Sequence, residues 1–138
     1  MDKVEMLKVS PLFAGLRKKQ LEAVAGTART LTFSEGDAII KEGDQSSIGF
    51  YVLGSGTADV TKDGQVVTSY GPGDYFGEIA LLTDEPKRTA TVIATSDAEV
   101  LGVTKWDFRA LVNAQPDIAV QVMDELARRL EETQSLSD

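Results

Sequence analysis

The sequence contains no cysteine and no histidine among its 138 residues. Without cysteine there are no disulfides and no thiol chemistry, and without either residue there are no zinc or haem sites that rely on these ligands. Catalysis by serine–histidine or cysteine–histidine pairs is excluded for the same reason. Few enzyme classes remain, and we predict that the chain is not an enzyme.

A basic surface and a long apolar segment are also missing. The formal net charge is -8, the isoelectric point is near 4.5, and no run is rich in lysine and arginine, so the sequence predicts no binding to nucleic acid. No run of about 18 apolar residues is present, and the opening MDKVEMLKVS has no apolar signal core. We therefore expect no membrane insertion and a cytoplasmic location.

The residues that are present predict one compact domain over residues 1–138. Apolar residues at helical spacing in KKQLEAVAGTA indicate a helix in an N-terminal part of about residues 1–28. From about residue 29 to residue 103, apolar and polar residues alternate, and turn sequences such as SEGD, KDG and GPGD separate the runs. This pattern predicts a mainly β fold, a jelly-roll barrel of about eight strands.

Two helices are expected to follow, over about residues 104–134. Thr104 and Asp107 form a capping pattern, and Pro116 suits the first turn of the second helix. An apolar stripe along that helix consists of Ile118, Val122, Leu126 and Leu130. The stripe covers its own domain, or it meets a ligand or a second chain, and the pattern favours neither. Trp106 is expected to pack near the end of the barrel.

The stretch FGEIALLTDEPKRTATV, residues 76–92, combines features that suit a phosphate-bearing ligand. Gly77 allows close approach of the backbone at a helix N-terminus, where unpaired amides attract an oxyanion. Glu78 can accept a hydrogen bond from a sugar hydroxyl, and Arg88 offers a forked guanidinium to phosphate oxygens. Each of the two is ordinary by itself, as a helix-start carboxylate and as a partner in a surface ion pair.

Together, FGEIALL and the following RTATV resemble the phosphate-binding cassette of the cyclic nucleotide-binding domain family, which includes catabolite activator proteins and protein kinase regulatory subunits. PLFAGL, the EGD turns, FYVLGSGTADV and GPGDYFGE also lie where that family has them. The resemblance covers nearly the whole chain. It implies a β jelly-roll with an N-terminal helix and two C-terminal hinge and lid helices.

The resemblance also implies roles for single residues. Glu78 is similar to the acidic residue that binds the ribose 2'-hydroxyl, and Arg88 to the arginine that pairs with the cyclic phosphate. Backbone amides of Gly77, Ile79 and Ala80 complete the expected contacts. The implied ligand-binding set is Phe76, Gly77, Glu78, Ile79, Ala80, Arg88, Thr89 and Ala90, and the candidate lid is Val122, Leu126 and Leu130.

Two points concern the choice of residue and ligand. Glu78 and Arg88 are ten positions apart, one more than in the family's kinase subunits and channels and similar to its catabolite-activator branch, so Lys87 is a rival phosphate partner. Arg88 is preferred because RTATV matches the family motif and lysine lacks the fork. Thr89 is similar to the hydroxyl residue that follows the arginine in members that bind cyclic GMP. Threonine also occurs there in members that bind cyclic AMP, and we favour cyclic AMP as the ligand.

The implied function is a cyclic nucleotide sensor whose ligand repositions the C-terminal helices, with Leu81 contacting the first of them. No cofactor is expected beyond the ligand, cyclic AMP or cyclic GMP. The expected partner is an effector protein or a second copy that binds through the C-terminal helix. The alternatives are a jelly-roll interaction module without a ligand and a sensor domain excised from a larger kinase, channel or transcription factor. The sequence argues against a metal-dependent jelly-roll enzyme, because the metal sites of such enzymes use histidine and this chain has none.

Overall fold

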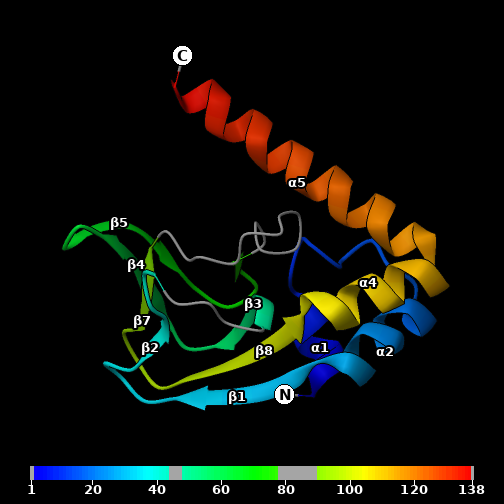
Figure 1. Ribbon diagram of the computed structural model, residues 1–138, viewed down its shortest axis with the longest axis horizontal. Coiled ribbons are helices and arrows are strands. Elements are labelled where there is room, and N and C mark those ends of the chain that lie inside the picture. Colours follow the sequence, from blue (N-terminus) through cyan, green and yellow to red (C-terminus); the bar gives the residue numbers. More distant parts are fainter. Residues whose placement is uncertain (1, 44–47, 78–89, 138) are drawn as a thin grey trace.

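The fold consists of short helices, two β-sheets and a long C-terminal helix (Figure 1). The computed structural model describes residues 2–43, 48–77 and 90–137. Two helices precede the strands, α1 (Lys3–Lys8) and α2 (Lys18–Thr27). The spacing of apolar residues predicted the second of them. The side chain of Asp2 caps α1 by accepting a 2.8 Å hydrogen bond from the Glu5 amide.

Eight strands follow in the described residues, as the alternating pattern predicted. They are β1 (Arg29–Phe33), β2 (Ala38–Ile40), β3 (Ile48–Ser55), β4 (Ala58–Lys62), β5 (Gln65–Tyr70), β6 (Tyr75–Phe76), β7 (Thr91–Ala94) and β8 (Ala98–Thr104). The turn between β4 and β5 has positive φ angles of 53° at Asp63 and 80° at Gly64. These angles suit a two-residue hairpin turn, which explains the KDG sequence.

The strands form two antiparallel four-stranded sheets, with the orders β1-β8-β3-β6 and β2-β7-β4-β5. This arrangement confirms the predicted jelly-roll. The predicted barrel is not closed, because no described strand of one sheet is hydrogen-bonded to a strand of the other. The two sheets instead lie face to face as a sandwich, and side chains between them hold them together.

The sheet that contains β3 and β8 is covered on both faces. Phe50 and Val52 of β3 and their partners on β8 face a core that the helices share. Tyr51 and Leu53, which point the other way, face a second core shared with β2, β4 and β7. Strict alternation along β3 therefore separates the helix side from the sandwich side.

Two helices complete the chain, α4 (Lys105–Ala114) and α5 (Pro116–Ser137). The hydroxyl of Thr104 accepts a 3.0 Å hydrogen bond from the Asp107 amide, which confirms the predicted cap. Gln115 ends α4, and Pro116 begins α5, as predicted. Figure 1 shows α5 starting beside α4 and running away from it toward the C-terminus of the chain.

Candidate functional site

The predicted cassette joins the two sheets. Its first predicted residues, Phe76 and Gly77, lie at the end of β6, the edge strand of one sheet. Its last, Ala90, immediately precedes β7, an inner strand of the other sheet. The remaining predicted ligand contacts and their neighbours lie outside the described residues: Glu78, Ile79, Ala80, Leu81, Lys87, Arg88 and Thr89. Their roles stay predictions.

A tight turn fixes the chain before β6. The carboxylate of Asp74 accepts a 2.8 Å hydrogen bond from the Gly71 amide, and the Asp74 amide donates to the Gly71 carbonyl at 3.1 Å. Gly73 has φ +93° and donates its amide to the Leu53 carbonyl at 2.7 Å. A Cβ at Gly73 would lie 2.6 Å from the carbonyl oxygen of Val9. The turn is therefore anchored both to β3 and to the segment after α1.

Gly77 has φ +80°, a backbone conformation that residues with a side chain rarely adopt. The residue is half-buried and follows β6 directly. This conformation gives a physical reason for glycine at the first position of the cassette, independent of any ligand. Close approach of a ligand to the Gly77 backbone is compatible with it and stays a prediction.

Phe76 contributes to the core between the sheets. Its ring stacks on Tyr51 at a centroid distance of 5.4 Å and on Tyr70 at 5.2 Å. The Phe76 side chain is only 2% exposed. Tyr51 and Tyr70 lie in β3 and β5. Because the Phe76 side chain is buried and stacked on two tyrosine rings, it serves the core between the sheets, and its predicted ligand contact stays a prediction.

The strand that leads to the cassette also contacts α5. The Tyr75 hydroxyl donates to Oε1 of Glu125 at 3.3 Å, and the guanidinium of Arg129 lies 4.6 Å from the centroid of the Tyr75 ring. Nη1 of Arg129 donates to the Tyr75 carbonyl oxygen at 3.3 Å. Helix α5 is thus attached to the residue two positions before Gly77. We call this set, Tyr75, Glu125 and Arg129, the β6–α5 contact.

The side chain of Glu125 is only 8% exposed, and a buried carboxylate needs partners for its charge. Arg128 supplies them, with Nε 3.0 Å from Oε2 and Nη2 2.7 Å from Oε1. The hydrogen bond that Arg128 donates to Glu125 and the negative charge of Glu125 raise the pKa of Arg128, and the charge of Glu132 adds to this. Arg128 is therefore a cation that can neutralise the carboxylate of Glu125.

Sequence reasoning missed the β6–α5 contact, although the sequence contains a signal for it. Positions 118, 122, 125 and 129 share one face of a helix, and the structure buries Ile118 and Val122 there. A carboxylate at position 125 on such a face is a sign of a polar partner inside the protein. Only the fold, which brings β6 next to α5, identifies that partner as Tyr75.

The candidate lid residues differ in burial. Val122 is 3% exposed and belongs to the core of the helices, and Leu126 packs against the same core. Leu130, one helical turn further, is 58% exposed. The first part of the predicted stripe therefore covers its own domain, and its last residue is accessible.

Trp106 does not pack against the end of the sheets, and that prediction is wrong. Its side chain is 64% exposed on α4. The ammonium of Lys105 and the guanidinium of Arg109 lie 5.2 Å and 5.5 Å from its ring centroid. These two cation–π contacts suit an indole that lies at the surface.

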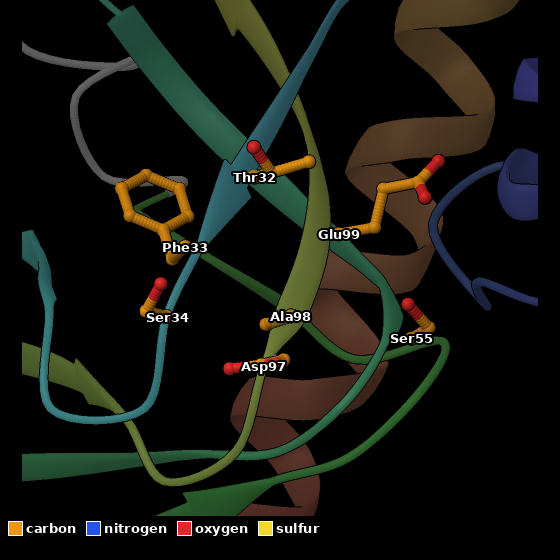
Figure 2. Close-up of a pocket in the computed structure, with 7 residues that line it drawn as sticks. All are labelled: Thr32, Phe33, Ser34, Ser55, Asp97, Ala98 and Glu99. Carbon is orange, nitrogen blue, oxygen red and sulfur yellow. The ribbon is translucent and has the colours of Figure 1, made fainter.

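A surface pocket of about 340 Å³ lies at the turn end of the sheet that contains β1 and β8 (Figure 2). It is lined by Thr32, Phe33, Ser34, Ser55, Asp97, Ala98 and Glu99. Two of these residues are acidic and none is basic, so the pocket does not suit an anion. None of Phe76, Gly77 and Ala90 lines it, and we do not assign it to the cassette.

Within residues 2–43, 48–77 and 90–137, no group of three acidic side chains lies close enough together to hold a metal ion. No helix in these ranges has the length and apolar character needed to cross a membrane.

Comparison with known families gives one match, to the cyclic nucleotide-binding domain, over residues 30–115. Among curated proteins, the chain is 42% identical over 106 residues to the cAMP-dependent protein kinase regulatory subunit of Hypocrea atroviridis, which covers 77% of this chain. The chain spans only 22% to 28% of the length of five cAMP-dependent protein kinase regulatory subunits that are among its matches.

Solved structures agree with the fold. The catabolite activator protein of Thermus thermophilus superposes with a TM-score of 0.81 at 32% identity, over 94% of this chain and 62% of that one. The regulatory domain of Toxoplasma gondii PKA with cAMP superposes with a TM-score of 0.76 at 32% identity, over 94% and 49% of the two chains.

Proposed function

The chain belongs to the cyclic nucleotide-binding domain family, and from this membership we propose that it is a regulatory sensor that binds a cyclic purine nucleotide in its cassette. The observation that carries the proposal is the family match over residues 30–115, because this range includes both FGEIALL and RTATV. The described ends of the cassette add support, since Gly77 follows β6 of one sheet and Ala90 precedes β7 of the other. The proposal assigns no catalytic step to the domain.

The ligand contacts follow the roles implied by the sequence. Glu78 accepts a hydrogen bond from the ribose 2'-hydroxyl, and Arg88 donates two parallel hydrogen bonds to the cyclic phosphate. Backbone amides at Gly77, Ile79 and Ala80 bind the remaining phosphate oxygens. Because the net charge of the chain is -8, this local set of donors has to attract the anion against the field of the whole molecule.

Cyclic AMP is the favoured ligand, and cyclic GMP is the alternative. Relatives with solved structures include proteins crystallised with cAMP, and this supports the choice for the present chain. A cGMP-dependent protein kinase of Plasmodium berghei is also similar, at 38% identity over 94 residues. Thr89 offers a hydroxyl that accepts a hydrogen bond from the amino group of a syn guanine. Its substitution should therefore change the affinity for cyclic GMP more than the affinity for cyclic AMP.

Ligand binding is proposed to reposition the C-terminal helices. Gln115 separates α4 from α5, and this break offers a point about which the two helices can pivot. Of the three candidate lid residues, Val122 is already in the core, so the role falls on Leu126 and Leu130. The ligand shifts the equilibrium only as far as it binds the two arrangements differently.

The partner is proposed to be an effector protein or a second copy of the chain, bound through α5. The exposed apolar side chains Val120, Met123 and Leu130 support this proposal. They recur at three- and seven-residue intervals, and they leave one stripe of α5 uncovered. A cytoplasmic location and a larger parent protein, such as a kinase, channel or transcription factor, remain parts of the proposal.

A jelly-roll interaction module without a ligand is the second candidate. The family match alone is compatible with it, because a fold can persist after its ligand site is lost. The presence of both Glu78 and Arg88 in the sequence favours the sensor. An unpaired arginine in an apolar pocket would be costly without a phosphate beside it.

Thermal unfolding with cyclic AMP, cyclic GMP and 5'-AMP tests the proposal. A ligand at one hundred times its dissociation constant adds about 2.7 kcal/mol to the free energy of unfolding. We expect such a shift with at least one cyclic nucleotide and a much smaller one with 5'-AMP, which has no cyclic phosphate. If no cyclic nucleotide raises the melting temperature at millimolar concentration, the interaction module becomes the better explanation.

A further inference from the structure

Trp106 is an exposed aromatic side chain on α4, and the proposed function gives it no role. The side chain is 64% exposed, and the charged groups of Lys105 and Arg109 lie 5.2 Å and 5.5 Å from the ring centroid. An exposed indole leaves a large apolar area in water, and tryptophan and arginine are among the residue types that most often anchor protein–protein interfaces. We call this set, Lys105, Trp106 and Arg109, the cationic knob.

The pocket at the turn end of β1 and β8 is a second feature without a role. Its volume of about 340 Å³ is near the lower end of the range for ligand sites, about 300 to 1,000 Å³, so it suits one bulky group. Phe33 contributes an aromatic ring to the lining, and Asp97 and Glu99 contribute negative charge (Figure 2). The pocket therefore offers both of the properties that an indole with neighbouring cations requires.

Contacts between turns hold the walls of this pocket in place. Oδ1 of Asp97 accepts a 3.2 Å hydrogen bond from the Glu35 amide, and Oγ of Ser96 accepts a 3.0 Å hydrogen bond from the Thr57 amide. A Cβ at Gly56 would overlap with the carbonyl oxygen of Asp97, so the turn between β3 and β4 lies tightly against the turn before β8. A pocket that is formed in advance loses little conformational entropy when it is filled.

The knob and the pocket lie at opposite ends of β8. The strand runs from Ala98 to Thr104, and seven residues at about 3.3 Å each separate the two ends by about 20 Å. In Figure 1, β8 runs from the turns beside β1 to the start of α4. Trp106 therefore cannot reach the pocket of its own chain, and a partner has to supply the pocket that it enters.

The distribution of charge favours a second copy of the chain as that partner. Residues 1–29 and 104–114, which include α1, α2 and α4, contain eight basic and four acidic residues, whereas the rest of the chain contains six basic and eighteen acidic residues. The turns that border the pocket, residues 34–37 and 95–97, contain three acidic residues and no basic one. The part of the chain around the knob is thus complementary in charge to the part around the pocket.

We propose that the cationic knob of one copy inserts into the acidic pocket of a second copy, with the indole against Phe33 and the two cations beside the carboxylates. The contact is heterologous, because each copy uses one surface for the knob and another for the pocket, so it builds a row or a ring of copies. The net charge of -8 on each copy keeps it weak and reversible. The contact needs no bound nucleotide, so this proposal and the proposed function fail separately.

Fluorescence of Trp106, the only tryptophan of the chain, tests the contact directly. Trp106→Ala keeps the pocket and has no tryptophan, so it is added at up to about 1 mM to about 1 µM wild type, a range that covers weak interfaces. We expect the emission to shift to shorter wavelength and quenching by acrylamide to fall, because the indole leaves water. No change at the highest concentration overturns the proposal. A shift only with vesicles of phosphatidylserine and phosphatidylcholine would assign the knob to a lipid surface instead.

Glu99→Lys/Trp106→Ala is the titrant with a blocked pocket. It should bind wild type at least about tenfold more weakly than Trp106→Ala, since it places a lysine against the two cations of the knob. Glu131→Lys/Trp106→Ala is the matched control, because it makes the same change of charge at an exposed carboxylate on α5, and it should bind as Trp106→Ala does. Equal affinity of the blocked and control titrants contradicts the proposal. Should melting curves show that the lysine variant unfolds, Glu99→Gln/Trp106→Ala replaces it.

Exchanging the charges tests whether the cations of the knob meet the carboxylates of the pocket. Lys105→Glu/Arg109→Glu keeps Trp106 and should bind Trp106→Ala at least about tenfold more weakly than wild type does. Binding should return in part when the titrant is Glu99→Lys/Trp106→Ala, because the charges are again opposite. A structural defect in either variant cannot produce this recovery. If the exchanged pair binds no better than each mismatched pair, the proposal is wrong.

Sedimentation velocity separates this contact from association through α5. Wild type should form species larger than a dimer as its concentration rises to about 1 mM, and Trp106→Ala and Glu99→Lys should each lose these species. A mixture of the two variants should form one complex of two copies, because it has one working knob and one working pocket. If wild type stops at a dimer and Trp106→Ala behaves identically, another surface carries the association, and the head-to-tail contact is refuted.

Discussion

Gly73 and Val9 approach each other so closely that a Cβ on the glycine would lie 2.6 Å from the valine carbonyl oxygen. Gly73 belongs to the turn before β6, and Val9 follows α1. The N-terminal helices are thus in contact with the segment that leads to the cassette. Because the obstructing atom is a backbone oxygen, it cannot move aside as the end of a flexible side chain could.

This relationship predicts the effect of Gly73→Ala on stability. The substitution is opposed by the φ of +93° and by the overlap with Val9, and we expect it to cost about 2 to 4 kcal/mol of unfolding free energy. Gly36→Ala is the matched control, since Gly36 has φ +94° but no atom within 4 Å of the added Cβ. It should cost about 1 to 2 kcal/mol, from the backbone conformation alone.

Urea denaturation of the two variants and the wild type measures both costs. The difference between them reports the steric part of the Gly73 effect. Equal losses in the two variants would mean that the turn can move away from Val9, and that the N-terminal helices do not restrain the chain before β6.

The sequence predicted those parts of the fold that local patterns determine. The Thr104 cap, the start of α5 at Pro116 and the Asp63–Gly64 turn each depend on a few neighbouring residues. The pairing of β1 with β8 joins residues such as Leu31 and Val100, and no local pattern encodes it. The family resemblance gave the jelly-roll, but it did not show that the sheets remain two separate layers.

The same distinction applies to the site. Gly77 was predicted from its sequence context, and its φ of +80° gives a local reason for a glycine there. Trp106 was expected to pack near the end of the barrel, whereas its side chain is exposed on α4 beside Lys105 and Arg109. Glu125 was not singled out, because its partner Tyr75 is 50 residues away in the sequence. Contacts between distant segments are the part that required the structure.

The burial along α5 predicts different effects for two apolar residues of the stripe. Val122→Ala should cost about 2 kcal/mol of unfolding free energy, because the side chain is 3% exposed in the core. Leu130→Ala should change stability by less than about 0.5 kcal/mol, because the side chain is 58% exposed. If Leu130 closes over the ligand, the same variant should weaken cyclic AMP binding about three- to tenfold.

Urea denaturation and isothermal titration separate the two roles of the stripe. Ala127→Ser, an exposed change between Leu126 and Leu130, serves as the control for binding. A Leu130→Ala protein that binds cyclic AMP as the wild type does would remove Leu130 from the lid and leave only Leu126.

Thr89 predicts a difference between the two cyclic nucleotides. Thr89→Ala should weaken cyclic GMP by about 1 kcal/mol, because only a syn guanine can donate its amino group to the hydroxyl. The affinity for cyclic AMP should change much less, since adenine carries its amino group at C6 and has none at C2. Isothermal titration with both ligands gives the comparison, and Thr89→Ser should behave as the wild type. Equal losses for the two nucleotides would remove Thr89 from base selection.

The last prediction concerns the two neighbouring cations in the cassette sequence. Arg88→Ala should cost about 2 to 5 kcal/mol of binding free energy, because it removes the forked partner of a partly desolvated phosphate. Lys87→Ala should cost under about 1 kcal/mol, as expected for an exposed charge near a ligand. Arg88→Lys should recover little, because an ammonium on a flexible stem cannot reproduce two parallel hydrogen bonds.

Isothermal titration of the three variants with cyclic AMP measures these costs, and melting curves confirm that each protein folds. Lys87 and Arg88 are adjacent, and Arg88 lies ten positions after Glu78. This separation is one residue longer than in the family's kinase subunits and channels, so Lys87 lies at the position that their spacing would give. The two alanine variants remove the same charge from adjacent positions, so each is the control for the other. If Lys87→Ala is the damaging change and Arg88→Ala the mild one, the phosphate partner is Lys87, and the bidentate geometry proposed for the site is wrong.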